Sequence, residues 1–580
     1  MNPDMFLTDI FLALVVTIVT TCTGGGFVFF LTKGRNIVAR IALSFATGFV
    51  IISLSGILAS FFSLSPPLFQ IPLIILGIIL FIIFCKNHQL TLPNRQDSTV
   101  LILAGVYVLI LISFFTAIVI WRAGDVTVHA SIVRMIMDGI SVPVSIYPVG
   151  SSWDYYPKGF HYYTSFWTLF FPLINTITII PILITAATSV LLYAIIREYY
   201  PGWCACTAFI LACFCFPQHF DNLIWGGYPS ATAQMLFVAI ILAIIIEKRI
   251  LLLLLLGLLL THTRFIIYLV PVLAFWIGGE WMIQSGLIKK ERIYILTGIC
   301  ILILFLLCIP LMLSSTSYIF WILSEKTLTT EFITRWVFAL LSVFGILIAY
   351  YRFHAMERLA LAWVAGLSVI VLLVDSEILV ITTATRVISQ LYLPFAFFAA
   401  IALAYMTWQL KDTRLRTIVS VFLILGGIGI MGAVFYSYAG SFALPEDDYQ
   451  AMQWLRDQNF THPICINIDP TGMLVYPLTG IPVTEPTLIP KPEINGSFSF
   501  SELSSKIVAD PTDPTIPDLI RSLPYHPVLL YISSISRTNP DYNPPFFNFY
   551  DGIYRTVNVN EMSDYYTILY DSGATIVSIS

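Results

Sequence analysis

The chain has 580 residues, of which 58% are hydrophobic and only 11% are charged. Soluble proteins carry about 25% charged residues, so this composition excludes a soluble multidomain enzyme and indicates that most of the length crosses a lipid bilayer. The net charge of −4 gives no indication of a nucleic-acid partner.

Apolar segments long enough to cross a bilayer recur along the first 440 residues. A spanning helix needs about 20 mainly apolar residues, and by this rule we expect about 14 spans. Residues 1–440 are therefore expected to form a polytopic α-helical membrane domain. The spans are expected near 7–32, 41–62, 70–85, 99–121, 177–197, 203–217, 231–247, 249–261, 265–284, 293–313, 333–351, 359–375, 391–409 and 417–437.

The distribution of Lys and Arg predicts how these spans are oriented. Sixteen of these residues fall in one set of loops and seven in the opposite set. Basic residues collect on the cytoplasmic side, so we expect a multi-pass protein of the cytoplasmic membrane whose N-terminus and C-terminal region face outside. This orientation requires that 159–171 forms a partial or interfacial helix and not a full span.

The longest external loop, 121–176, contains the first two candidate catalytic residues, Asp125 and His129. Asp125 and His129 are four residues apart, which places them on one face of a helix. Val128 and Ile132 belong to an apolar stripe that would lie along the membrane surface. A carboxylate at the membrane border could act as a general base or help to hold a divalent cation. The alternatives are a helix N-cap for Asp125 and a packed core residue for His129.

A second polar group follows in the same loop, in the run W-D-Y-Y-P-K-G-F-H. Asp154 is a second candidate catalytic carboxylate, and with Asp125 it is a candidate ligand for Mg²⁺ or Mn²⁺. Lys158 and His161 are candidate ligands for a phosphate. The aromatic side chains around them suit stacking on sugar rings, although such rings are also typical of membrane interfaces.

Other polar residues lie at the outer ends of the expected spans. His219 and Asp221 precede W-G-G-Y-P in an external turn, and His262 and Arg264 interrupt an apolar stretch. Arg386 comes just before a span. Arginine offers a planar set of donors to phosphate, although a basic side chain can also reach the interface without binding anything. We expect these residues to share one cavity at the outer face.

The composition changes after about residue 440. Residues 441–580 are rich in Pro, Asp, Asn and Ser and are predicted to form a small extracytoplasmic α/β domain. A helix is expected over 446–458, with strands at 464–468, 528–532 and 575–580.

Together, these motifs resemble the GT-C superfamily of integral-membrane glycosyltransferases, in its prokaryotic form with a C-terminal extracytoplasmic domain. The resemblance rests on A-G-D-x-x-x-H, Y-P-K-G-F-H, W-G-G-Y-P and R-x-I-S-Q-L-Y-L-P. It implies transfer of a sugar from a polyprenyl-phosphate-linked donor to a glycan, lipid or protein acceptor. It also implies that Asp125 is the essential acidic residue of the external loop. In this sequence several spans precede that loop, where members of the family more typically have one, and Asp125 has no adjacent carboxylate.

Two other functions stay open on the sequence alone. A transporter or flippase of lipid-linked glycans would usually have internal repeats and broken or charged helices near the bilayer centre. A non-catalytic membrane scaffold would present the C-terminal domain and would bind no lipid-linked ligand. The sequence favours the glycosyltransferase because its unexplained polar residues lie at span ends.

Overall fold

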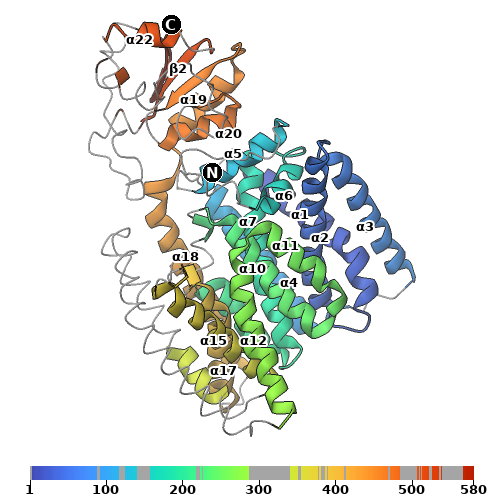
Figure 1. Cartoon of the computed structure of the whole chain (residues 1–580). Helices are drawn as coiled ribbons and strands as arrows, with labels where there is room; N and C mark the ends of the chain where they lie inside the picture. The colour runs from blue at the N-terminus through green and yellow to red at the C-terminus, as the bar shows by residue number, and fades with distance from the viewer. Residues whose placement is uncertain are drawn as a thin grey trace.

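A computed structural model describes most of the chain as helices followed by a small sheet (Figure 1). Ten helices within the described residues are long and apolar enough to cross a membrane. They include α1 (Pro3–Leu31), α2 (Ile37–Phe61), α3 (Pro67–Asn87), α4 (Arg95–Thr116), α7 (Leu173–Arg197), α10 (Tyr228–Ile246), α12 (Arg264–Gln284), α15 (Ala355–Asp375), α17 (Tyr392–Gln409) and α18 (Thr413–Phe442). The predicted fold class, a polytopic helical membrane protein with a small C-terminal α/β region, is confirmed. The residues described are 3–87, 92–116, 125–139, 157–216, 222–224, 226–286, 340–349, 354–376, 378–379, 386–387, 389–409, 413–467, 470–483, 506–507, 510, 513–521, 525–534, 537 and 566–579.

Two of the expected spans are shorter than a full crossing. Residues 203–217 correspond to α8 (Gly202–Ile210) and a π-helical turn, η2 (Leu211–Cys215), and residues 249–261 correspond to α11 (Leu251–Thr261). The α8–η2 segment is almost wholly buried among other helices, so its apolar character reflects packing against protein. The expected span at 293–313 lies outside the described residues, and of 333–351 only 340–349 is described.

Close packing of helices α1 and α2 depends on small residues. A Cβ added to Gly48 would lie 1.9 Å from the carbonyl oxygen of Thr20, and one added to Gly24 would lie 2.0 Å from that of Ser44. Both positions therefore require glycine, because the two backbones touch there. Small residues at helix interfaces are the usual route to such contacts in membranes.

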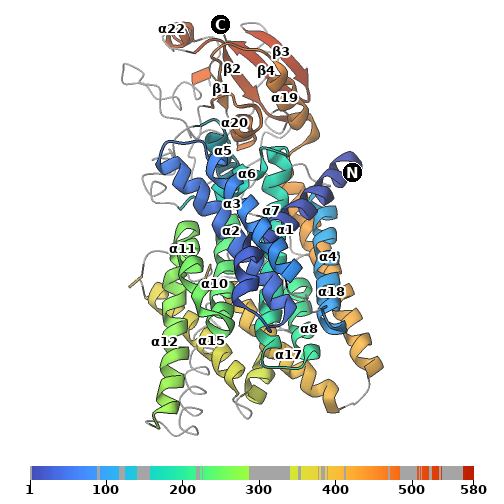
Figure 2. The ribbon, with the colours of Figure 1, turned by 90° about the vertical axis from the view of Figure 1, so that its right-hand side faces the viewer.

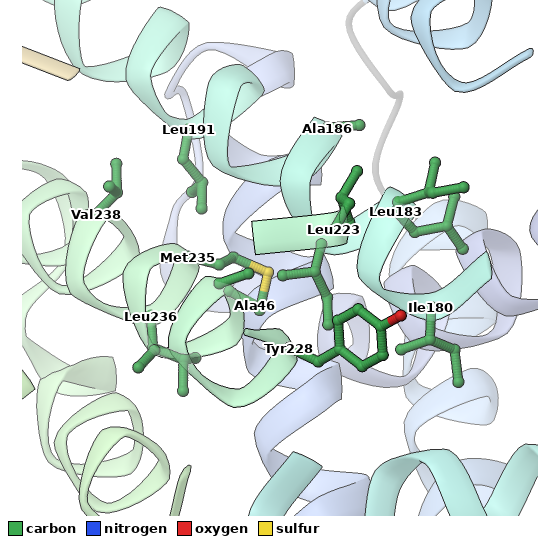
Figure 3. Close-up of a cluster of buried hydrophobic side chains, with 14 of the residues drawn as sticks. Ala46, Ile180, Leu183, Ala186, Leu191, Leu223, Tyr228, Met235, Leu236 and Val238 are labelled. Atoms are coloured by element: carbon green, nitrogen blue, oxygen red, sulfur yellow. The ribbon is translucent and has the colours of Figure 1, made fainter. Parts of the chain in front are cut away.

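The centre of the bundle is an apolar core shared by α2, α7 and α10. Figure 3 shows Leu223 and Tyr228 lying together beside Ile180 and Leu183 of α7. Met235, about two turns further into α10, is fully buried in the same core. This packing fixes the N-terminal end of α10, which lies beside the candidate site described below.

The C-terminal region contains a four-stranded mixed sheet with the order β1-β2-β4-β3. Strands β1 (Ile464–Asn467) and β2 (Val528–Ile532) are parallel, while β4 (Ala574–Ile579) is antiparallel to both β2 and β3 (Thr567–Ser572). The predicted helix is α19 (Glu446–Asp457), which packs on β3 and β4. The short helices η5 (Pro470–Leu474), α20 (Val475–Thr479) and α22 (Ile516–Arg521) complete the described part of this region.

The sheet region covers one end of the helical bundle (Figure 2). Between them lie two short helices, α5 (Asp125–Met137) and α6 (Gly159–Trp167). The nine residues of α6 are too few to cross a bilayer, as the orientation assigned from the sequence requires. Helix α5 packs on α6 and α7 on one side and on η5 and α20 on the other.

Polar interactions lie at the edge of the contact between α20 and α5. The Tyr476 hydroxyl donates to Asp138 Oδ2 at 3.1 Å, and Asp138 also forms an ion pair with Arg134, with 2.9 Å between Arg134 Nε and Asp138 Oδ1. Gly480 has a φ of +82°, and a Cβ there would lie 2.6 Å from Arg134 Nη2. The apolar stripe that the sequence assigns to the membrane surface is therefore buried in protein. Ala130 and Ser131, the small residues between members of the stripe, are buried as well.

Candidate functional site

Asp125 is the first residue of α5, at the end of the bundle that the sheet region covers. Its backbone lies against the W-G-G-Y-P turn, where Gly226 has a φ of +89°. A Cβ on Gly226 would lie 2.4 Å from the Val126 nitrogen and 3.0 Å from the Asp125 carbonyl carbon. Glycine is therefore required for both its positive φ and its close approach, and this contact sets where α5 begins.

Two arginines that are distant in sequence act on the Asp125 carboxylate. Surrounding protein raises the pKa of Asp125 to about 6, although the positive charges of Arg386 and Arg264 pull this pKa down. Part of the Asp125 surface stays accessible, and Arg386 is exposed. The carboxylate is thus mostly ionised at neutral pH, and the charges of two cationic side chains act on it.

Behind Asp125, on the same face of α5, His129 meets His161 of α6. Their ring atoms Nδ1 and Nε2 are 2.9 Å apart, and both side chains are buried. Burial, with smaller contributions from Lys158 and His262, lowers the pKa of His129 to about 3. Burial, then His129 and Lys158, holds the pKa of His161 well below its usual value. Two neutral imidazoles and one buried lysine thus lie next to each other.

Helix α6 is held in place by the end of α11. A Cβ on Gly159 would lie 2.8 Å from both the Leu260 carbonyl oxygen and Thr261 Oγ1, so the two backbones are in contact. The Tyr228 ring lies 6.1 Å from His129 and 5.8 Å from Phe160, measured between ring centroids. Helices α5, α6, α10 and α11 therefore meet around the histidine pair.

His262 links this group to the arginines. It follows the last residue of α11 and precedes Arg264, the first residue of α12. Burial lowers the pKa of His262 to about 3, with Arg264 and then Arg386 adding to the effect. Because His262 also interacts electrostatically with His129, the arginine side and the histidine side of the group are continuous.

The structure brings together most of the site residues predicted from the sequence, at one end of the bundle. These are Asp125, His129, Lys158, His161, His262, Arg264 and Arg386. The other three, Asp154, His219 and Asp221, lie outside the described residues. The common function of the seven remains a prediction.

The residues around Asp125 do not by themselves form a site for a hard divalent cation. Mg²⁺ and Mn²⁺ prefer several oxygen ligands, whereas the described neighbours of Asp125 include two guanidinium groups. Among the residues that the structure describes, no group of three His, Cys, Asp or Glu side chains could hold a metal ion. Asp154, the second candidate ligand, lies outside them.

Two buried glutamines outside the set predicted from the sequence form a pair, one member of which reaches the Arg386 backbone. Gln234 Nε2 donates to Gln390 Oε1 at 2.7 Å, and Gln390 Nε2 lies 3.4 Å from the Arg386 carbonyl oxygen. A polar amide inside an apolar span is a signal available from sequence, and Gln234 is such a residue. Gln390 belongs to the R-x-I-S-Q segment already singled out.

Comparisons with known proteins give only distant structural likeness. No protein-family model matches the sequence, and no curated protein matches it either. The archaeal oligosaccharyltransferase AglB from Archaeoglobus fulgidus, in complex with an inhibitory peptide and a dolichol-phosphate, superposes with a TM-score of 0.41 and 12% identity, over 84% of this chain and 74% of that one. The Archaeoglobus fulgidus oligosaccharyltransferase in complex with Zn and sulfate gives a TM-score of 0.38 and 12% identity, over 82% and 72%. These values are too low to assign this chain a family or an activity.

Proposed function

We propose that the chain is a membrane glycosyltransferase that moves a sugar from a polyprenyl-phosphate-linked donor to an acceptor outside the cytoplasm. The observation that carries this proposal is a carboxylate, Asp125, on which the charges of two arginines, Arg386 and Arg264, act at one end of a membrane-spanning bundle. We assign the chemistry to residues 1–440 and treat 441–580 as an extracytoplasmic domain that covers the site.

We assign a side chain to the proton transfer and to the departure of the leaving group. Asp125 accepts the proton of the acceptor hydroxyl as its oxygen attacks the anomeric carbon of the donor sugar. The bond between that carbon and the phosphate oxygen breaks, and the polyprenyl phosphate leaves with an added negative charge. Arg386 and Arg264 stabilise this charge, because preorganised cations near a leaving group lower the barrier. A single displacement of this kind inverts the configuration of the sugar.

The raised pKa of Asp125, about 6, suits this role. A general base works best when its pKa lies near the operating pH, and an aspartate of ordinary pKa would be a weaker base. The neutral histidines matter for the same reason. His129 keeps a pKa of about 3 and adds no positive charge that would bring the Asp125 pKa down again. Lys158 and His161 complete the proposed binding surface for the donor head group, and Asp154, His219 and Asp221 stay candidates for it.

The replacement Asp125→Asn tests the assignment of the base. The amide keeps the size of the side chain and cannot accept the proton, so we expect transfer to fall by at least about 100-fold, the low end of what a general base contributes. Transfer is measured with the purified full-length chain and a polyprenyl-phosphate sugar in detergent micelles.

The matched control is Asp457→Asn, which removes an exposed carboxylate at the end of α19. We expect this variant to transfer sugar at the wild-type rate and the Asp125 variant to unfold at the wild-type temperature. Transfer by Asp125→Asn at the wild-type rate would eliminate Asp125 as the base. Binding of the lipid-linked donor without any transfer by the wild-type chain would favour a transporter or flippase, and the absence of both binding and transfer would favour a scaffold.

A further inference from the structure

A chain of hydrogen bonds runs through the apolar part of the bundle to the backbone of Arg386. The Tyr392 hydroxyl donates to Gln234 Oε1 at 3.2 Å, and Gln234 Nε2 donates to Gln390 Oε1 at 2.7 Å. The Gln390 amide in turn reaches the Arg386 carbonyl oxygen at 3.4 Å, and this carbonyl also accepts from Ser389 Oγ at 2.8 Å. This series of hydrogen bonds therefore ends at Arg386, the arginine whose charge acts on Asp125.

The two glutamine amides are buried, so breaking the hydrogen bonds between them costs free energy. Gln234 and Gln390 are 4% and 6% exposed and line a small pocket whose other walls are apolar or aromatic. A buried amide that loses its partner keeps the desolvation cost without the compensating bond. The two glutamines must therefore stay paired, and the η4 segment (Ser389–Leu391) must stay at a fixed place beside α10.

Helix α10 connects this pair to the start of α5. Its first residue, Tyr228, follows the Gly226 turn that touches the Asp125 backbone, and Gln234 lies six residues further along the same helix. Six residues of α-helix span about 9 Å. One rigid element thus contacts both the carboxylate side and the arginine side of the site, and it sets the separation between them.

Resting on the function proposed above, we propose that Gln234 and Gln390 are positioning residues that hold Arg386 at the distance from Asp125 at which it binds the donor phosphate. Neither glutamine touches the substrate in this arrangement. Both act through the Arg386 backbone, and their loss weakens phosphate binding while the fold is kept.

The paired change Gln234→Met with Gln390→Met tests this proposal. It replaces both amides by apolar side chains of similar length. Tyr392→Phe is made in the same variant, so that the hydroxyl that donates to Gln234 Oε1 is not left buried without that partner, and folding is preserved. We expect the Kd for a polyprenyl monophosphate in detergent micelles to rise about tenfold, the equivalent of one displaced charge-assisted hydrogen bond. The apolar swap Leu393→Met in the same pocket is the matched control, because it conserves volume and breaks no hydrogen bond.

A double-mutant cycle separates positioning from a general structural effect. In an Arg386→Ala background the paired glutamine change is expected to alter the Kd by less than about twofold, since the group that it positions is already gone. Wild-type affinity in the paired variant, or a full tenfold further loss in the Arg386→Ala background, would overturn the proposal while leaving the proposed function standing. If the wild-type chain itself does not bind the lipid phosphate, the proposed function fails first and the positioning role fails with it.

Discussion

Asp125 is subject to two opposed influences, and their balance determines when it can act as a base. The surrounding protein destabilises the charged carboxylate and raises its pKa to about 6, while Arg386 and Arg264 favour the charged form. Without the arginines the carboxyl would hold its proton to higher pH. Without burial it would be a weak base.

This balance predicts the pH dependence of transfer. Below pH 6 the Asp125 carboxyl keeps its proton and cannot accept another, so kcat/KM should fall about tenfold per pH unit on the acid side and level off above pH 7. Arg264→Gln removes a charge that lowers the Asp125 pKa, so the midpoint should move to higher pH. Measurement of kcat/KM against pH for both proteins checks this. A midpoint near 4, the ordinary value for aspartate, or one that does not move in the variant, would contradict it.

At the level of elements, the position of α5 depends on a turn made by another part of the chain. The Gly226 turn touches the α5 backbone at Asp125 and Val126, and α20 covers the far side of the helix. The helix that carries the proposed base is thus held from both sides. Its position depends on the absence of a side chain at residue 226.

We therefore expect Gly226→Ala to lower both stability and transfer. The added methyl group would overlap the Val126 nitrogen, and alanine disfavours a φ of +89°, at a combined cost of about 1–3 kcal/mol. Gly105→Ala in α4 is the control, because a Cβ there meets nothing within 4 Å and alanine stabilises a helix interior by up to about 1 kcal/mol. Tm and transfer rate are measured for both variants. Equal Tm values for them would show that the Gly226 contact does not hold α5.

The same pattern of contacts explains which elements could be predicted from sequence. Long apolar segments indicate spans wherever they face lipid, and α19, β1, β2 and β4 follow from local periodicity. Strand β3 was not predicted because none of its residues is buried, and exposed and half-buried residues do not alternate along it. The site was predicted as a set of polar span ends. Which of them meet depends on packing between distant residues, such as His129 with His161 and Gln234 with Gln390, 32 and 156 positions apart.

For the whole molecule, the distribution of basic residues predicts that the sheet region lies outside the cell. Arg456→Cys places a thiol on the exposed surface of α19, and Lys86→Cys places one at the last turn of α3. We expect a membrane-impermeant maleimide to label the first variant in intact cells and the second only after permeabilisation. The unmodified chain gives the background from its native cysteines. The reverse labelling pattern would invert the orientation and place the candidate site in the cytoplasm.

The contact between α20 and α5 has a consequence for biosynthesis. Tyr476 and Asp138 are separated by 338 positions along the chain, so the ribosome makes α5 long before it makes the surface that covers it. At ordinary rates of translation this interval is on the order of tens of seconds. During that time α5 lacks one of its two packing surfaces. A nascent chain that stalls or is cleaved before residue 470 would leave α5 uncovered, so the packing of α5 is completed only when η5 and α20 have been synthesised.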